Sequence, residues 1–211
     1  MFEPELIASY VYNSNRLDGI TLSEADTNRI LAEDVDPEQE IAGEDGRTFE
    51  AEVVLGHDRA LRGMGLTAQT PGPFTREQLL LLHKTLMGNL LLSAGEYREC
   101  TLRYKGLLIA SPPQHLEERM AWLVNLINTG LERAQDPHKF SWRIHHEFIT
   151  LHPFIEANGR LARLLLNLVR LRRGLDLTVV PFPDREAYSR AILEFQQQKI
   201  LRAQERANSA E

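Results

Sequence analysis

The sequence predicts an all-α fold, a helical bundle that carries one small β-hairpin. Its 211 residues are 43% hydrophobic and 26% charged, which is the composition of an ordinary globular protein. Helix start and stop signals recur from residue 75 onward, and the apolar residues between them keep helical spacing. Residues 101–104 and 107–110 read as extended segments around a Lys105-Gly106 turn. Because a lone hairpin is barely stable in water, we expect it to lean on the helices.

The first two predicted helices follow a capping pattern and a proline pair. Thr75 and Gln78 match a capping box, and the apolar run that they open continues to about Asn89. A second helix follows the prolines at 112–113, and we expect Gly130 to end it.

Three further helices begin at capping residues. Asp136 followed by Pro137 is a typical helix start. The next helix is expected to begin at Asn158, as its N-cap, and to end before Gly174. Asp184 caps the last helix, which continues into the polar C-terminus.

Charge is unevenly distributed along the chain. The formal net charge is −6, but residues 1–60 alone contain 15 acidic residues against four arginines. We expect most of these acidic side chains to form a solvated surface. We divide the chain into an N-terminal helical arm, a core domain and a polar tail, which span residues 1–65, 66–200 and 201–211.

The sequence argues against several classes of protein. It has no apolar run of 18 residues, and its start lacks the basic flank and apolar core of a secretory signal, so we expect a cytoplasmic protein without a membrane span. Cys100 is the only cysteine, which excludes a disulfide framework and zinc sites built on paired thiolates. A phosphate-binding P-loop, a zinc-protease HExxH motif and a hydrolase GxSxG motif are also absent.

The chemistry is concentrated in residues 152–163, which read HPFIEANGRLAR. The helix that follows is apolar at nearly every position through residue 171, so we expect it to be buried on most sides. Its polar exceptions are spaced by three, four and three residues and share one face; they are Arg160, Arg163, Asn167 and Arg170. Buried charges are costly unless paired. An anion is therefore expected to meet this face.

The start of the same helix suggests which anion binds. The free N–H groups after Asn158 and the positive end of the helix dipole attract negative charge, and Gly159 lets a ligand approach the backbone. Together with two arginines, this arrangement fits a chain of phosphates. Glu156 fits beside phosphates if Mg²⁺ lies between them. His152 suits a general base, with an unperturbed pKa of about 6.5.

This stretch resembles the signature of the Fic (filamentation induced by cyclic AMP) family, HxFx(D/E)(A/G)N(G/K)RxxR, and it fills every fixed position. The resemblance covers at least residues 75–195, including Gly95-Glu96-Tyr97-Arg98 before the hairpin and Arg185-Glu186-Ala187-Tyr188 after the motif. It implies a Fic-type helical bundle in which the hairpin is a flap.

The resemblance also implies a reaction, the transfer of AMP from ATP to a hydroxyl of a target protein. His152 would deprotonate the acceptor hydroxyl, and Glu156 would hold Mg²⁺ against the phosphates. Arg160 would neutralise the bridge between the α- and β-phosphates, and Arg163 would hold the γ-phosphate. Gly159 stands where phosphorylating relatives have Lys, which favours AMP transfer. The residues that the resemblance assigns to the nucleotide are Ala157, Asn158, Gly159, Arg160, Arg163 and Tyr188.

A regulatory motif is suggested near the N-terminus. Residues 14–19, SNRLDG, resemble the family's inhibitory motif (S/T)xxxE(G/N), with Ser14, Asp18 and Gly19 at the motif positions. In that motif a glutamate pairs with the second signature arginine, here Arg163. Asp18 is one methylene shorter, which leaves weak, water-mediated or absent inhibition open, and the alternative is an ordinary Asp-Gly turn.

The flap would dock the target segment as an added strand. The residues assigned to it are Leu102, Tyr104, Lys105, Gly106 and Leu107. The expected partner is a protein with a hydroxyl acceptor, and self-modification and a homodimer are compatible with the sequence. Nucleic acid is not expected, because the net charge is negative. The alternatives are removal of AMP, transfer of another phosphate-linked group, and a non-enzymatic regulator.

Overall fold

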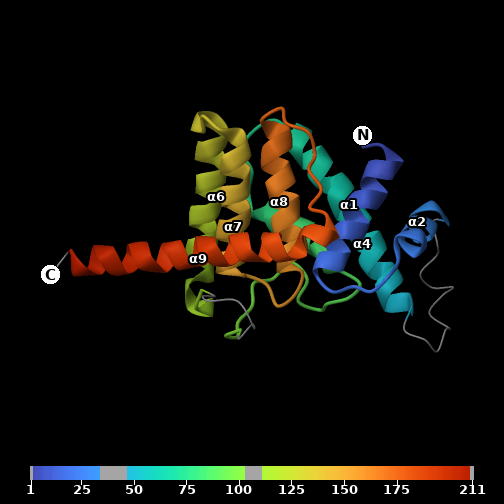
Figure 1. The fold of residues 1–211 in the computed structure, drawn as a ribbon, viewed down its shortest axis with the longest axis horizontal. Coiled ribbons are helices and arrows are strands. Elements are labelled where there is room, and N and C mark those ends of the chain that lie inside the picture. Colours follow the sequence, from blue (N-terminus) through green and yellow to red (C-terminus); the bar gives the residue numbers. More distant parts are fainter. Residues whose placement is uncertain (1, 34–46, 103–110, 210–211) are drawn as a thin grey trace.

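The computed structural model describes residues 2–33, 47–102 and 111–209, and within them the chain is helical without an assigned strand. The helices form a bundle from which one helix projects (Figure 1). In chain order they are α1 (Pro4–Leu17), α2 (Glu24–Glu33), α4 (Arg47–Gln69), α5 (Arg76–Met87), α6 (Leu116–Arg133), α7 (Pro137–Leu151), α8 (Asn158–Arg172) and α9 (Arg185–Asn208). Short 3₁₀ turns at Pro113–His115 and Phe182–Asp184 precede α6 and α9. The all-α prediction is confirmed for these ranges.

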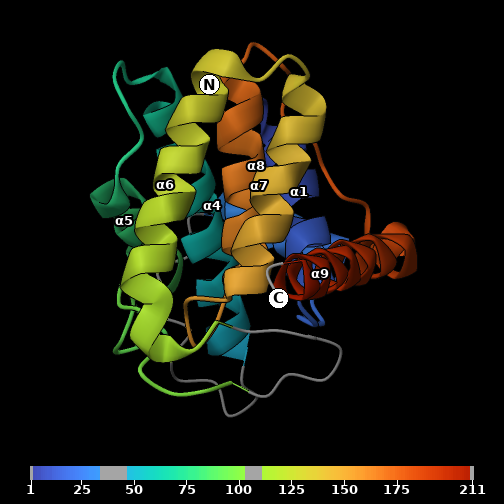
Figure 2. The same ribbon diagram turned by 90° about the vertical axis from the view of Figure 1, so that its left-hand side faces the viewer.

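Helix α8 lies in the middle of the bundle, beside α7 and α4 (Figures 1 and 2). It is buried along most of its length, as its apolar sequence predicts, and α1 also contacts it. The leucines of α8 share one hydrophobic core with Val54 and Leu61 of α4 and with Phe148 of α7. The N-terminal end of α8 is thus held rigidly from three sides.

The local start signals are confirmed at α5 and α7. Thr75 and Gln78 form both hydrogen bonds of the capping box. At α7, the Asp136 side chain accepts a hydrogen bond from the Lys139 N–H group, and Pro137 occupies the first turn. These caps fix where α7 begins and therefore the position of its C-terminal end, where the candidate site lies.

The prediction that Gly130 ends a helix is wrong, because α6 continues through it to Arg133. A Cβ atom added to Gly130 would lie 1.9 Å from Cζ of Phe140 on α7. The glycine is therefore required by the close approach of α6 to the Phe140 ring rather than by a helix end.

The expected boundary between residues 65 and 66 falls inside α4, which packs against α5 and α8. The N-terminal arm and the core domain therefore share one hydrophobic core. Most of the predicted hairpin lies outside the described residues, including Tyr104, Lys105, Gly106 and Leu107, while Leu102 is described and has no regular secondary structure. None of the helices in the described ranges combines the length and hydrophobicity needed to cross a bilayer.

Candidate functional site

The loop between α7 and α8 is folded back on itself by one side-chain amide. Asn158 Oδ1 accepts a hydrogen bond from the Phe154 N–H group at 3.0 Å, and its Nδ2 donates to the Phe154 carbonyl at 2.8 Å. The predicted N-cap role of Asn158 is wrong, since Ala157 is the N-cap residue and adopts a left-handed φ of 61°. The amide of Asn158 is buried and engaged with the loop, so it shapes the turn that precedes α8.

A ring stack anchors this loop in the core. Phe154 is fully buried and stacks on His83 of α5, with ring centroids 3.7 Å apart. His83 Nδ1 accepts a hydrogen bond from the Gly95 N–H group, so its Nε2 carries the proton and donates to the Glu156 carbonyl at 3.3 Å. Burial lowers the pKa of His83 to about 4, which keeps the ring neutral. The backbone of Glu156 is thereby held at the mouth of the site.

His152 follows α7 directly in a left-handed conformation, with φ 47°. Its carbonyl accepts a hydrogen bond from Nε of Arg98 at 2.8 Å, which fixes the backbone at this unusual position. Burial, reinforced by the charge of Arg98, lowers the pKa of His152 to about 4. The imidazole is therefore neutral at physiological pH and able to accept a proton.

The two arginines at the start of α8 meet the end of α1. Arg163 is 2% exposed, and its Nη2 donates to Asp18 Oδ1 at 2.7 Å and to the Ser14 carbonyl at 2.8 Å. Its Nε donates to the Ser14 hydroxyl at 2.7 Å. Arg160 Nε contacts the other oxygen of Asp18 at 3.3 Å. The structure therefore places Ser14 against Arg163 and the carboxylate of Asp18 against both Arg160 and Arg163.

A tyrosine from α9 completes the surroundings of Arg163. Nη1 of Arg163 donates to the Tyr188 hydroxyl oxygen at 3.1 Å, and that oxygen lies 2.7 Å from Nε2 of the fully buried His145. Burial keeps the pKa of His145 well below its usual value, so the ring is neutral. Since Arg163 can only donate, the Tyr188 proton is free to point to His145 Nε2.

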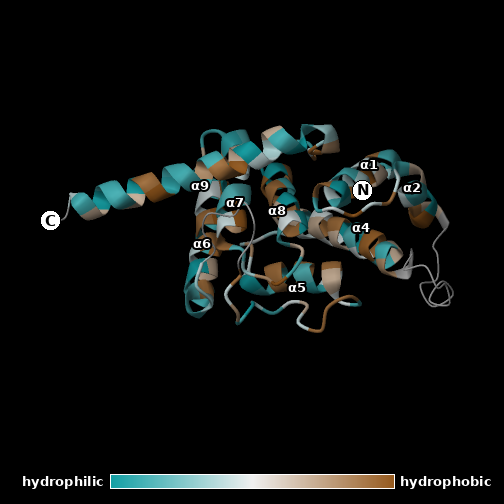
Figure 3. Ribbon diagram, turned by 60° about the horizontal axis from the view of Figure 1, so that its bottom comes forward, coloured by the Kyte–Doolittle hydropathy of each residue, from teal (hydrophilic) through white to brown (hydrophobic). Residues whose placement is uncertain are grey.

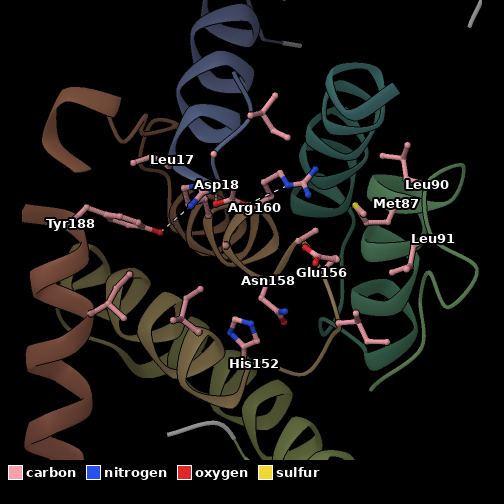
Figure 4. Close-up of a pocket in the computed structure, with 18 of the residues that line it drawn as sticks. Leu17, Asp18, Met87, Leu90, Leu91, His152, Glu156, Asn158, Arg160 and Tyr188 are labelled. Carbon is pink, nitrogen blue, oxygen red and sulfur yellow. Dashed lines mark hydrogen bonds and ion pairs between the residues drawn. The ribbon is translucent and has the colours of Figure 1, made fainter. Parts of the chain in front are cut away.

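One cavity of about 610 Å³ is lined by the side chains that these contacts position, namely Asp18, His152, Arg160, Arg163 and Tyr188. His152 lies across it from Asp18 and Arg160, with Glu156 and Asn158 along one side and Tyr188 at the other (Figure 4). Gly19 also lines the cavity, beside Gly159 and Arg163. The described residues contain no cluster of three or more His, Cys, Asp or Glu that could hold a metal ion alone.

Sequence reasoning missed the groups that reach the site from distant segments. His83, Arg98 and His145 support the loop, its backbone and Tyr188, respectively. His57 of α4 is fully buried, and burial together with the charges of Arg160 and Arg163 keeps its pKa well below 6.5. Arg98 belongs to the Gly95-Glu96-Tyr97-Arg98 stretch of the family resemblance, but no role was assigned to it there. No local pattern marks His57, His83 and His145, because each acts through a contact with a residue far away in the sequence.

The comparisons with known proteins agree with this site. Residues 73–169 match the profile described as the Fic/DOC family, which includes the α7–α8 loop and both arginines. The chain is 32% identical over 182 residues to "Protein adenylyltransferase fic-1" of Caenorhabditis briggsae, an alignment that covers 85% of this chain and 34% of that protein. The chain thus spans about a third of the length of that curated relative.

Two solved structures share the fold over most of the chain. A Fic domain containing signaling protein from Bacteroides thetaiotaomicron has a TM-score of 0.77 and 25% sequence identity, covering 90% of this chain and 71% of that one. Fic-1 from C. elegans has a TM-score of 0.73 and 26% identity, covering 98% of this chain and 65% of that one. On the signature, the profile match and the fold, residues 73–169 of the chain form a Fic/DOC domain.

Proposed function

We propose that the protein is an adenylyltransferase that moves AMP from ATP to a Ser, Thr or Tyr hydroxyl of a target protein. The observation that carries this proposal is the convergence of a neutral histidine, two buried arginines and a helix N-terminus on one cavity. The name of the C. briggsae relative, a protein adenylyltransferase, supports it.

In the proposed reaction, the acceptor oxygen bonds to the α-phosphorus of ATP. The bond from that phosphorus to the bridging oxygen of the pyrophosphate breaks, and pyrophosphate leaves with its electron pair. The acceptor proton passes to the neutral imidazole of His152, which burial keeps unprotonated. Catalysis of this kind depends on positioning and on stabilising charge, which a cavity lined by fixed arginines can provide.

The phosphates are proposed to bind at the start of α8. Nη1 of Arg160 is buried and has no hydrogen-bond partner in the described part of the chain. An unsatisfied buried donor of this kind is costly, and a phosphate oxygen would satisfy it. Gly159 exposes the backbone N–H groups of the first turn, which favour an anion. Tyr188 lines the same cavity and is proposed to contact the adenine.

Glu156 is the residue proposed to hold Mg²⁺. Its side chain is exposed at the cavity and forms no ion pair within the described residues, so the carboxylate is available to a cation. A single carboxylate fits Mg²⁺, because this ion usually takes its remaining ligands from phosphates and water. When bound, Mg²⁺ would neutralise charge on the phosphates.

Asp18 is proposed to compete with ATP for these arginines. A Cβ atom added to Gly159 would lie 2.5 Å from Asp18 Oδ1, so the carboxylate covers the first turn of α8. It also engages Arg160 and Arg163 together. A phosphate that binds the same N–H groups and guanidinium groups would have to displace it.

The test is intact-mass measurement after incubation with ATP and Mg²⁺. In the Asp18→Gly background we expect self-modification, seen as a mass gain of one AMP, that His152→Ala abolishes. His138→Ala is the matched control, because His138 is an exposed residue of α7, the helix that His152 follows. Equal modification with and without His152 would overturn the role of this residue. No mass gain on the protein or on added target proteins would overturn the proposed activity.

A further inference from the structure

A second cavity, also of about 610 Å³, lies between α9 and the pair α6 and α7. Its charged lining comes from Arg119 of α6, from Arg143 and Glu147 of α7, and from Lys199, Arg202 and Arg206 of α9. We call this cavity the basic groove. It shares no lining residue with the nucleotide cavity.

The positive charge of the basic groove is largely uncompensated. Glu147, the acidic residue in its lining, is engaged by an ion pair with Lys199. The four arginines form no hydrogen bond or ion pair with any described residue; they are Arg119, Arg143, Arg202 and Arg206. Four guanidinium groups around one hollow repel one another, so an anion that binds there would relieve that repulsion.

The geometry of α9 presents these charges along a line. Lys199, Arg202 and Arg206 are spaced by three and four residues and therefore share one face of the helix. The end of α9 projects beyond the bundle and is mostly hydrophilic (Figures 1 and 3). An extended ligand can therefore lie along this face and contact α6 and α7 at the same time.

We propose that the basic groove binds an acidic segment of the polypeptide that the protein modifies. This inference rests on the proposed function, which requires a polypeptide acceptor. Guanidinium groups bind carboxylates through paired hydrogen bonds, so arginine rather than lysine suits Asp and Glu side chains.

Nucleic acid fits the basic groove less well than an acidic peptide. Single strands bind where aromatic rings are open for bases to stack. Phe195, the aromatic residue in the lining, is partly buried and packs on His146 with ring centroids 5.2 Å apart. Trp122 is exposed but lies outside the lining, and Nζ of Lys199 faces its ring at 5.6 Å.

The position of the groove predicts a spacing in the target. Arg143 precedes His152 by nine residues on α7, which corresponds to about 14 Å along the helix axis. An extended polypeptide covers about 14 Å in about four residues. Because this axial rise is the smallest separation between the two places, we expect the acidic side chains to begin at least about four residues from the hydroxyl that accepts AMP.

The test is direct binding of labelled probes, measured by fluorescence anisotropy at low ionic strength. The probes are a peptide of ten glutamates, a peptide of ten glutamines and a ten-nucleotide thymidine strand. We expect the glutamate peptide to bind, with affinity that falls as salt is added, and the double variant Arg143→Glu, Arg202→Glu to weaken it at least tenfold. Arg202→Glu alone should weaken it less, and this residue lies on exposed helix surface where folding is not at risk.

Arg190→Glu is the matched control, because Arg190 is an exposed arginine of α9 outside both cavities. Equal weakening by Arg190→Glu would overturn the proposal, as would tighter binding of the thymidine strand. A wild-type dimer that the double variant dissociates would assign the groove to a second copy instead. The two proposals can fail separately: a protein that binds the glutamate peptide but transfers no AMP would overturn the proposed function and leave the acidic-peptide site in place.

Discussion

The carboxylate of Asp18 reaches Arg163 across 2.7 Å, although it is one methylene shorter than the glutamate of the family's inhibitory motif. Asp18 is the C-cap residue of α1, and Ser14, one turn earlier, binds the same guanidinium through its hydroxyl and its carbonyl. The end of α1 therefore lies close enough to α8 for the shorter side chain to make the contact. The shorter side chain of Asp18 therefore does not prevent the contact on which the proposed inhibition depends.

Asp18→Asn is expected to strengthen ATP binding by about tenfold, which corresponds to about 1.4 kcal/mol. The substitution keeps the size of the side chain but removes the negative charge that competes with phosphate. Isothermal titration calorimetry with ATP and Mg²⁺ measures the effect. Asp58→Asn is the control, because Asp58 pairs with Arg62 on α4 and does not line the nucleotide cavity. An unchanged ATP affinity in Asp18→Asn would argue against competition.

The sequence predicts those parts of the site that depend on residues close together in the chain. The Asp136-Pro137 start fixes α7, and the arginine spacing on α8 predicts that Arg160 and Arg163 lie together. The ion pair between Arg163 and Asp18 spans 145 residues, and its residues were found through a motif resemblance. The contact between His145 and Tyr188 could not be predicted in this way, because no motif in either segment indicates that the other segment lies beside it.

Two predictions from local sequence were wrong because Asn158 and Gly130 are residue types that can serve more than one structural role. An asparagine before a helix can cap it, but Asn158 closes the preceding loop onto Phe154. A glycine in a helical pattern can end the helix, but Gly130 makes room for the Phe140 ring. In both cases the structural role of the residue depends on a packing partner that the neighbouring sequence does not identify.

Tyr188→Phe is expected to destabilise the protein by about 1–3 kcal/mol. The substitution leaves Nη1 of Arg163 without its oxygen acceptor and Nε2 of His145 without its hydroxyl partner, both in a buried setting. Urea denaturation followed by tryptophan fluorescence measures the loss. Tyr12→Phe is the control, since the Tyr12 hydroxyl has no hydrogen bond within the described residues. Equal stability of both variants would show that the Tyr188 contacts contribute nothing.

Gly130→Ala is expected to destabilise the protein by about 1–3 kcal/mol through overpacking. The new methyl group would lie 1.9 Å from Phe140 Cζ, so the ring or α6 must move. Gly63→Ala is the matched control, because a Cβ atom there meets only Leu82 Cδ2 at 3.9 Å and alanine favours the helix. The melting temperature should fall in the first variant alone, and Phe140→Leu should restore part of it. A fall of the same size in both variants would contradict the packing explanation.

Stability is expected to fall as the pH drops from 6.5 to 5.5, because the fold buries neutral histidines. Burial lowers the pKa of His83, His146 and His152 to about 4, and it keeps the pKa of His57 and His145 well below 6.5. Below pH 6.5 these groups take up protons in the unfolded chain but not in the folded one.

The unfolded state is therefore favoured as the pH drops, by up to about 1.4 kcal/mol per pH unit for each histidine. Urea denaturation at pH 7.5, 6.5 and 5.5 measures the slope. His57→Gln should reduce the slope by the contribution of one histidine, whereas His138→Gln should leave it unchanged, because His138 is exposed. A free energy of unfolding that stays constant between pH 6.5 and 5.5 would show that these histidines are protonated in the folded protein as readily as in the unfolded chain.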